Sequence, residues 1–161
     1  MPTPPTAPAV PVAGGTLTLM NRPKFTALPA MRADGVTHLV TVLGRREGAL
    51  TLRNAARAAG LQWIWVELAN GNPPPAARDR ELIPVVRDLA GVLRDGGNVV
   101  VHCSAGIHRT GMVAYALLRA GGMRTDRARE TLGRLRTVAL DGVGEHRLAW
   151  AEGLCARAGW A

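Results

Sequence analysis

A cysteine and an arginine stand six positions apart, at Cys103 and Arg109, in the part of this sequence best suited to chemistry. The residues between them, each with a backbone N–H, are Ser104, Ala105, Gly106, Ile107 and His108. If these donors curl around the start of a helix, they form a nest that binds an oxyanion, and the Arg109 guanidinium adds two parallel donors suited to a phosphate. The positive electrostatic potential of these donors is expected to lower the pKa of Cys103, so that its sulfur becomes a thiolate and a nucleophile. The hydroxyl of Thr110 follows and can donate to that sulfur.

The residues on either side of this loop predict the elements that position it. Three β-branched valines at 99–101 run directly into the His102-Cys103 pair and predict a strand. Residues 109–120 are apolar and helix-forming, and two glycines follow them. Gly106 allows a backbone conformation that is closed to other residues. We therefore expect a strand, a tight loop and a helix start, with Cys103 at the bottom of the loop.

The segment 102–111 reads His-Cys-Ser-Ala-Gly-Ile-His-Arg-Thr-Gly and resembles the His-Cys-x5-Arg-Thr/Ser signature of cysteine-dependent protein tyrosine and dual-specificity phosphatases. The resemblance implies a small, bacterial-type single-domain member that hydrolyses phosphate monoesters through a phosphocysteine intermediate, without metal or cofactor. It implies catalytic roles for Cys103, Arg109 and Thr110, with residues 104–109 binding the phosphate. His102 would hydrogen-bond the loop behind the cysteine. A rhodanese-like sulfurtransferase, whose loop also cradles an anion around a cysteine, is a further alternative.

One position departs from the pattern of this family. Dual-specificity phosphatases carry a general acid, an aspartate, at the end of a strand upstream of the cysteine, and by spacing Asn70 stands there. An amide cannot supply the proton that the leaving group needs. The acid then comes from a substitute carboxylate, for which Asp79 is preferred over Glu67 and Glu81, or the enzyme works without one. The third alternative is a catalytically weak or inactive module that binds phosphate.

Two further parts of the sequence bear on the site. Residues 134–141 are similar to the family segment that helps to place the attacking water, with Asp141 and Glu145 as its polar candidates. His108, a basic residue inside the signature loop, would suit a substrate of higher charge. Cys155 lies at an apolar helical position, which favours burial over a role as a resolving thiol.

The order of the predicted elements indicates an α/β fold. Strands are predicted at 16–20, 36–43, 61–68 and 99–101, and helices at 25–32, 50–59, 80–93, 109–120, 125–135 and 143–158. Strands that alternate with helices predict a mostly parallel central sheet flanked by helices on both faces. A ligand would then lie at the carboxyl edge of the strands, where the Cys103 loop begins.

Composition limits the classes of protein to consider. The 161 residues fit one domain, residues 16–161, preceded by a flexible tail rich in proline and alanine over residues 1–15. We expect no membrane span and no secretory signal, and a reactive thiol suits the reducing cytoplasm. The net charge of +8 favours phosphorylated proteins or other phosphomonoesters as partners. The arginines are scattered rather than striped, so specific nucleic-acid binding is not expected.

Overall fold

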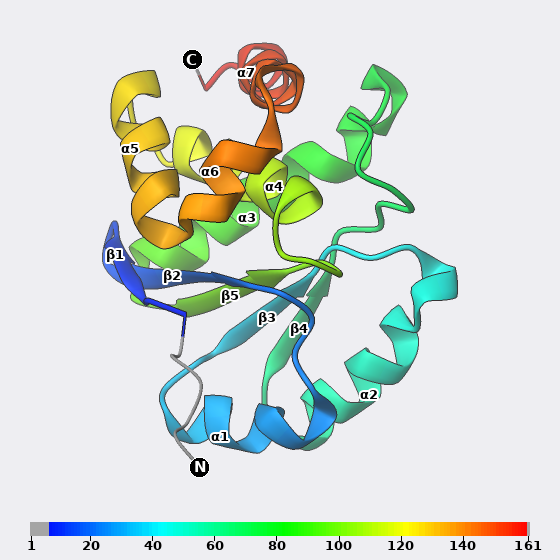
Figure 1. The fold of residues 1–161 in the computed structure, drawn as a ribbon. Helices are drawn as coiled ribbons and strands as arrows, with labels where there is room; N and C mark the ends of the chain where they lie inside the picture. Colours follow the sequence, from blue (N-terminus) through cyan, green and yellow to red (C-terminus); the bar gives the residue numbers. More distant parts are fainter. Residues whose placement is uncertain (1–6, 161) are drawn as a thin grey trace.

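A five-stranded sheet organises the computed structural model, which describes residues 7–160 (Figure 1). Its strands are β1 (Val10–Val12), β2 (Gly15–Met20), β3 (His38–Thr41), β4 (Gln62–Trp65) and β5 (Asn98–His102), in the order β1-β2-β5-β3-β4. Only β1 runs antiparallel to its neighbour, while β2, β5, β3 and β4 are parallel. The prediction of a mostly parallel sheet is confirmed.

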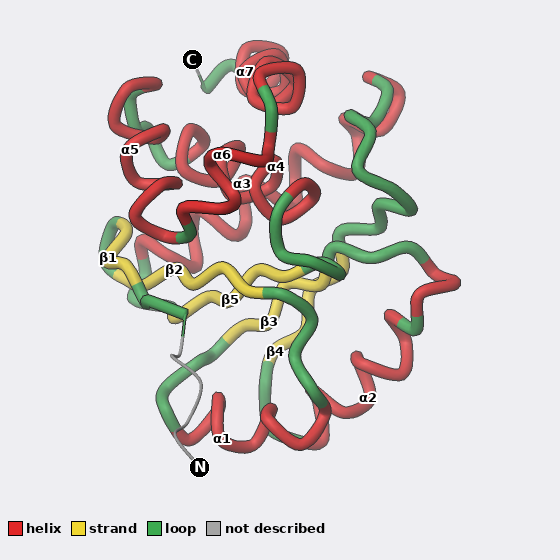
Figure 2. Tube along the Cα trace, in the orientation of Figure 1, coloured by secondary structure: helices red, strands yellow, loops and turns green. Residues whose placement is uncertain are grey.

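Helices cover both faces of this sheet (Figures 1 and 2). One face carries α1 (Leu28–Ala33) and α2 (Ala49–Ala58). The other carries α3 (Asp79–Arg94), α4 (His108–Ala120), α5 (Thr125–Leu135), α6 (Thr137–Val143) and α7 (Glu145–Ala158). Three short 3₁₀ helices, Phe25–Ala27, Arg45–Glu47 and Ala76–Arg78, lie in the connections. No helix in the described part of the chain is long and apolar enough to cross a membrane.

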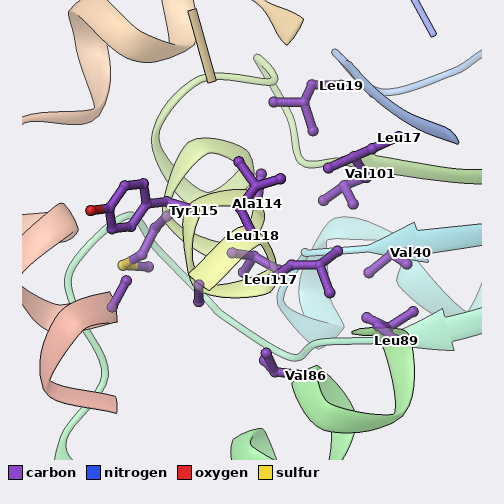
Figure 3. Close-up of a cluster of buried hydrophobic side chains, with 14 of the residues drawn as sticks. Leu17, Leu19, Val40, Val86, Leu89, Val101, Ala114, Tyr115, Leu117 and Leu118 are labelled. Atoms are coloured by element: carbon purple, nitrogen blue, oxygen red, sulfur yellow. The ribbon is translucent and has the colours of Figure 1, made fainter. Parts of the chain in front are cut away.

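The central strand β5 divides its side chains between two apolar cores, as the two-residue period of a strand requires. Val99 and Val101 belong to the larger core under α3 to α7, and Val100 belongs to the smaller core under α1 and α2. In the larger core α4 is buried along most of its length, and its Leu117 and Leu118 lie close to the side chains of the sheet and of α3 (Figure 3). This burial fixes the start of α4, and hence the Cys103 loop, against the sheet.

The parallel strands bring their carboxyl ends to one edge of the sheet (Figure 1). The register pairs His102 at the end of β5 with Met20 of β2 and Thr41 of β3. Loops that follow these strands therefore meet beside Cys103. The site is built at this edge.

Three local predictions differ from the structure. Val10–Val12, assigned to the flexible tail, forms β1, because Val10 and Val12 are buried on the larger core while Pro11 between them is exposed. Residues 1–6 of that tail lie outside the described residues. The last helix begins at Glu145 rather than Val143, since Gly144 adopts φ +79° and interrupts it. The short helix α6 precedes that break and was not predicted.

Candidate functional site

Cys103 directly follows β5 and is 3% exposed. Its Sγ accepts a hydrogen bond from the backbone N–H of Gly106 at 3.2 Å. Burial by itself raises the pKa of the Cys103 thiol, but hydrogen bonds from the Thr110 hydroxyl and from the backbone N–H groups of Thr110, Gly106 and Ile107 outweigh it and lower this pKa. The segment 103–107 thus curls around the sulfur, and backbone donors converge there.

The Thr110 hydroxyl is part of this arrangement. Its oxygen is buried and forms no hydrogen bond of ordinary geometry with any of residues 7–160. A buried hydroxyl without a partner is costly, and the Cys103 sulfur is the neighbouring group whose pKa this hydroxyl lowers. The hydroxyl stabilises the thiolate form of that sulfur.

Gly106 makes the tight curl of the loop possible. Its φ of +72° lies in the left-handed region. A Cβ atom placed on Gly106 would lie 2.6 Å from the backbone nitrogen of Asn21 and still closer to the carbonyl oxygen of Met20. The loop therefore packs its backbone directly against the chain that leaves β2, where the N–H of Arg22 also donates to the carbonyl of Ser104 at 3.1 Å.

We expect Gly106→Ala to destabilise the protein and to weaken oxyanion binding, because the added methyl group forces the loop away from β2. The free energy of unfolding should fall by about 2 kcal/mol or more. Urea unfolding and inhibition by orthovanadate measure the two effects. Gly122→Ala is a matched control: Gly122 also has positive φ, +92°, but a Cβ there meets nothing within 4 Å. Equal effects of the two substitutions would contradict the steric argument.

Arg109 reaches across the sheet edge from the first turn of α4. Its Nη1 donates to Glu47 Oε2 at 2.6 Å and to the carbonyl of Leu68 at 2.9 Å, and its Nη2 donates to Glu47 Oε1 at 3.0 Å. Glu47 raises the pKa of Arg109, and the nearby Cys103 raises it further. The guanidinium is therefore fixed beside the sulfur and is permanently charged.

Glu47 was not predicted as a site residue. Its carboxylate also accepts from the backbone N–H of Gly44 at 2.7 Å, and Arg22 donates to its carbonyl oxygen. Hydrogen bonds from Arg109 lower the pKa of this carboxyl more than its partial burial raises it. The sequence feature that could have identified Glu47 is its position shortly after strand β3, whose end lies at the same edge of the sheet as the Cys103 loop.

Glu47→Gln should remove a stabilisation that depends on pH. A carboxyl whose pKa is lowered by folding stabilises the folded state fully above its unfolded pKa of about 4.3, and this stabilisation is lost as the pH falls through the folded value. At pH 7 the substitution should cost about 1 to 3 kcal/mol, because it leaves the guanidinium of Arg109 without its charged partner. Urea unfolding between pH 7 and pH 3 measures both effects.

The matched control for Glu47 is Glu81→Gln. Glu81 forms an exposed ion pair with Arg78 at 3.1 Å, which is worth little. We expect unfolding free energies of wild type and of Glu47→Gln to converge as the pH falls, while Glu81→Gln follows wild type throughout. Parallel curves for wild type and Glu47→Gln would contradict the assignment.

A chain of hydrogen bonds holds the cysteine backbone from behind. The Trp63 indole N–H donates to Thr41 Oγ1 at 2.9 Å, and Thr41 Oγ1 lies 2.8 Å from His102 Nε2. On the other side of the imidazole ring, His102 Nδ1 lies 3.0 Å from the carbonyl oxygen of Cys103. Because that carbonyl only accepts, Nδ1 carries the proton and Nε2 accepts from Thr41. Burial lowers the pKa of His102 to about 4. His102 is thus neutral at pH 7 and holds the loop, as its interpretation from sequence stated.

A model of the family described as "Polymorphic toxin system, DSP-PTPase phosphatase" matches residues 13–122, which contain strands β2 to β5, Glu47 and the whole Cys103 loop. The chain belongs to this DSP-PTPase phosphatase family. The predicted resemblance to dual-specificity and tyrosine phosphatases is confirmed. No curated protein sequence matches the chain.

Solved structures of phosphatases share the fold of this family member. Tk-PTP in its active form superposes with a TM-score of 0.73 at 18% identity, covering 94% of this chain and 97% of its own. The kinase associated phosphatase KAP gives 0.73 at 14% identity, covering 89% and 86%. Human DUSP28 gives 0.67 at 21% identity, covering 88% and 92%. At these identities the likeness concerns the fold.

The segment between β4 and α3, where the phosphatase signature led us to expect an acid, is held by hydrogen bonds from arginine side chains. Three arginines each donate to a backbone carbonyl of this segment: Arg78 to Glu67 at 2.9 Å, Arg109 to Leu68 at 2.9 Å and Arg147 to Gly71 at 2.6 Å. Asn70 is exposed, and its Oδ1 accepts from the backbone N–H of Asn72 at 2.9 Å. Asn70 thus stabilises a local turn.

The structure places Asp79, the preferred substitute acid, against α7 rather than over the Cys103 loop. Its two carboxylate oxygens accept from Arg157 at 2.5 Å and 3.1 Å. Glu67 lies 3.8 Å from Arg45, and Glu81 pairs with Arg78. Each of the three carboxylates that the sequence offered therefore faces an arginine outside the loop.

The downstream segment does reach the loop, as the comparison with other phosphatases implied. Arg136 Nη2 donates to the carbonyl of Ala105 at 3.4 Å, and a Cβ on Gly142 of α6 would lie 2.6 Å from a methyl carbon of Ile107. Asp141 is exposed, and Glu145 forms a two-bonded ion pair with Arg129 at 2.7 and 2.8 Å. The α6 helix therefore forms one wall of the site.

Cys155 lies away from this site, in the interface between α7 and α4. Its sulfur is buried 3.9 Å from the carbonyl of Ala116, and burial raises the pKa of its thiol to about 11. Both cysteines are free thiols. Within residues 7–160 no group of three or more His, Cys, Asp or Glu side chains is placed to hold a metal ion.

Proposed function

We propose that this protein hydrolyses phosphate monoesters with Cys103 as the nucleophile. The observation that carries the proposal is the convergence of backbone N–H groups, the Thr110 hydroxyl and the Arg109 guanidinium on one sulfur whose pKa they lower. A lowered pKa favours the thiolate form of this sulfur, which faces a site that attracts an oxyanion. An activated thiolate beneath a bound phosphate is placed to attack phosphorus.

In the first step the Cys103 thiolate forms a bond to phosphorus and the ester oxygen leaves as an alcohol once it has gained a proton. The backbone N–H groups of residues 104–109 and the Arg109 guanidinium stabilise the charge on the three equatorial oxygens. In the second step water attacks the phosphocysteine, the S–P bond breaks, and orthophosphate and thiolate are released. Thr110 stabilises the thiolate as it leaves.

Asn70 supports a second candidate function, a module that binds phosphorylated ligands with little or no turnover. Its amide cannot donate the proton that a phosphatase acid supplies, and it is engaged in a local turn. Loss of such a proton donor costs about 10²- to 10⁴-fold in rate. A binding module would keep the oxyanion cradle intact while turning over slowly.

Rapid-quench kinetics with 4-nitrophenyl phosphate distinguishes the two. The phosphatase predicts a burst of 4-nitrophenol, up to one equivalent per enzyme, and a phosphate adduct on Cys103 in acid-quenched protein analysed by mass spectrometry. Binding of a phosphorylated peptide with neither burst nor adduct would support the module and contradict the phosphatase.

We expect the substrate to be a phosphorylated side chain of a protein or another phosphomonoester, since the chain is basic overall and its family acts on phosphates. A thiolate at the bottom of the site is inactivated by oxidation. The proposal therefore implies a reducing compartment such as the cytoplasm.

A further inference from the structure

A proton donor for the leaving group is missing from the segment that follows β4. Its backbone is held by arginines at the carbonyls of Leu68 and Gly71, and Asn70 offers only an amide. A carboxylate further along, Asp79, is ion-paired with Arg157 of α7. The donor must therefore come from another side of the site.

Two carboxylates near the other walls, Glu47 and Glu145, are committed to arginines. Glu47 binds Arg109 through both oxygens, and Glu145 binds Arg129 in the same way. Their arginine partners lower the pKa of both carboxyls, so each is ionised at neutral pH. An ionised carboxylate has no proton to give.

The in-line geometry of the reaction indicates that the proton donor lies on the outer side of the loop. An in-line displacement places the leaving oxygen opposite the Cys103 sulfur, away from the floor of the cradle. The residues of the loop that are exposed to solvent are Ser104, Ala105 and His108. Of these three, only the histidine has ring nitrogens that can give a proton to the leaving oxygen and take one from water.

His108 lies next to a glycine of each of two neighbouring segments. It is the first residue of α4 and directly precedes Arg109. A Cβ on Gly71 would lie 3.4 Å from His108 Cβ, and one on Gly142 would lie 4.0 Å from His108 Nε2. The imidazole thus stands between the segment after β4 and α6, and each faces it with a glycine that has no side chain.

The geometry points to His108 as the proton donor to the leaving group, in place of the aspartate that related phosphatases carry; this inference rests on the proposed function. As the S–P bond forms and the P–O bond breaks, the imidazolium gives its proton to the ester oxygen and becomes neutral. The neutral ring then takes a proton from the water that attacks the phosphocysteine. Each turnover returns His108 to its protonated form.

Charged groups on every neighbouring element will shape the pH dependence of this step. Arg109 and the Cys103 thiolate lie in the same loop, and Arg147 of α7 lies 3.2 Å from the Cβ position of Gly71. Asp141 and His146 flank the α6–α7 junction. Because His146 is a second exposed histidine near this wall, it provides the matched control.

The test compares single-turnover rate constants for cleavage of 4-nitrophenyl phosphate and phenyl phosphate by wild type and His108→Asn. The 4-nitrophenolate ion leaves without help, whereas phenolate needs a proton. We expect His108→Asn to slow phenyl phosphate cleavage about 10²- to 10⁴-fold. The same variant should change 4-nitrophenyl phosphate cleavage much less.

His146→Asn should behave as wild type with both esters. Equal losses on both esters in His108→Asn, no loss on either, or a selective loss in His146→Asn would each overturn the inference. The Cys103 adduct separates the two proposals. If His108→Asn still forms the adduct from 4-nitrophenyl phosphate, the proposed function stands whichever way the leaving-group comparison falls.

Discussion

Cys103→Ser should abolish phosphate-monoester hydrolysis, lowering kcat by about 10⁴-fold or more. The hydrogen bonds from Gly106, Ile107 and Thr110 favour the thiolate form of a cysteine, but a serine hydroxyl holds its proton far more strongly, and these hydrogen bonds are too few to remove it. Steady-state release of orthophosphate from 4-nitrophenyl phosphate measures the loss. Neither the burst nor the adduct should form.

Binding of inorganic phosphate separates this chemical loss from damage to the loop. The variant lacks the negative charge of the thiolate, which repels a bound anion, so isothermal titration calorimetry should show phosphate binding that is no weaker than in wild type. Cys155→Ala is the matched control, since that buried thiol lies against Ala116 and away from the cradle. Turnover that survives Cys103→Ser, or that is lost in Cys155→Ala, would contradict the assignment.

The fold could be predicted where hydrophobic periodicity is long and unambiguous. The helix expected at 80–93 is Asp79–Arg94, and the strand expected at 16–20 is Gly15–Met20. Short elements were not predicted, because their formation depends on tertiary packing. The three residues of β1 bury only two valines, and α6 spans two turns that are held between the Cys103 loop and α5. Neither segment is long enough to display a period.

The site could be predicted as far as its residues are contiguous in sequence. The loop from Cys103 to Thr110 is local, so its hydrogen bonds follow from its own composition. Glu47 is 62 positions from Arg109, and only the alignment of β3 beside β5 brings them together. The same register places Thr41 against His102. Long-range partners of this kind require the strand order, which no single stretch of sequence specifies.

The proton donor shows a further limit of prediction from spacing. Asn70 lies in the segment after β4, where spacing assigned the acid, and the substitute suggested by proximity in sequence, Asp79, points to Arg157. The arginine-rich composition explains this outcome, because most carboxylates have an arginine close enough to form an ion pair. A histidine inside the loop keeps an exposed ring in this environment.

Arg109→Lys should lower kcat by about 10²- to 10³-fold, the range for removing a donor that stabilises a transition state. The Arg109 guanidinium binds both carboxylate oxygens of Glu47 through two hydrogen bonds and also donates to the carbonyl of Leu68. A lysine ammonium keeps the charge but has one nitrogen, so it cannot bind the carboxylate and the phosphoryl oxygens in a fixed plane. The KM should rise less than kcat falls, because the charge that attracts the substrate remains.

Arg119→Lys provides a control from the same helix. Arg119 also binds a carboxylate through two nitrogens, that of Glu152, and is similarly buried, but its partner lies in α7. Both substitutions should lower the unfolding free energy by similar amounts, measured by urea unfolding, since each replaces a two-bonded ion pair. Only Arg109→Lys should reduce kcat for folded enzyme. If both variants lose activity in proportion to their stability, the guanidinium of Arg109 has a structural role alone, and the transition-state role proposed for it is wrong.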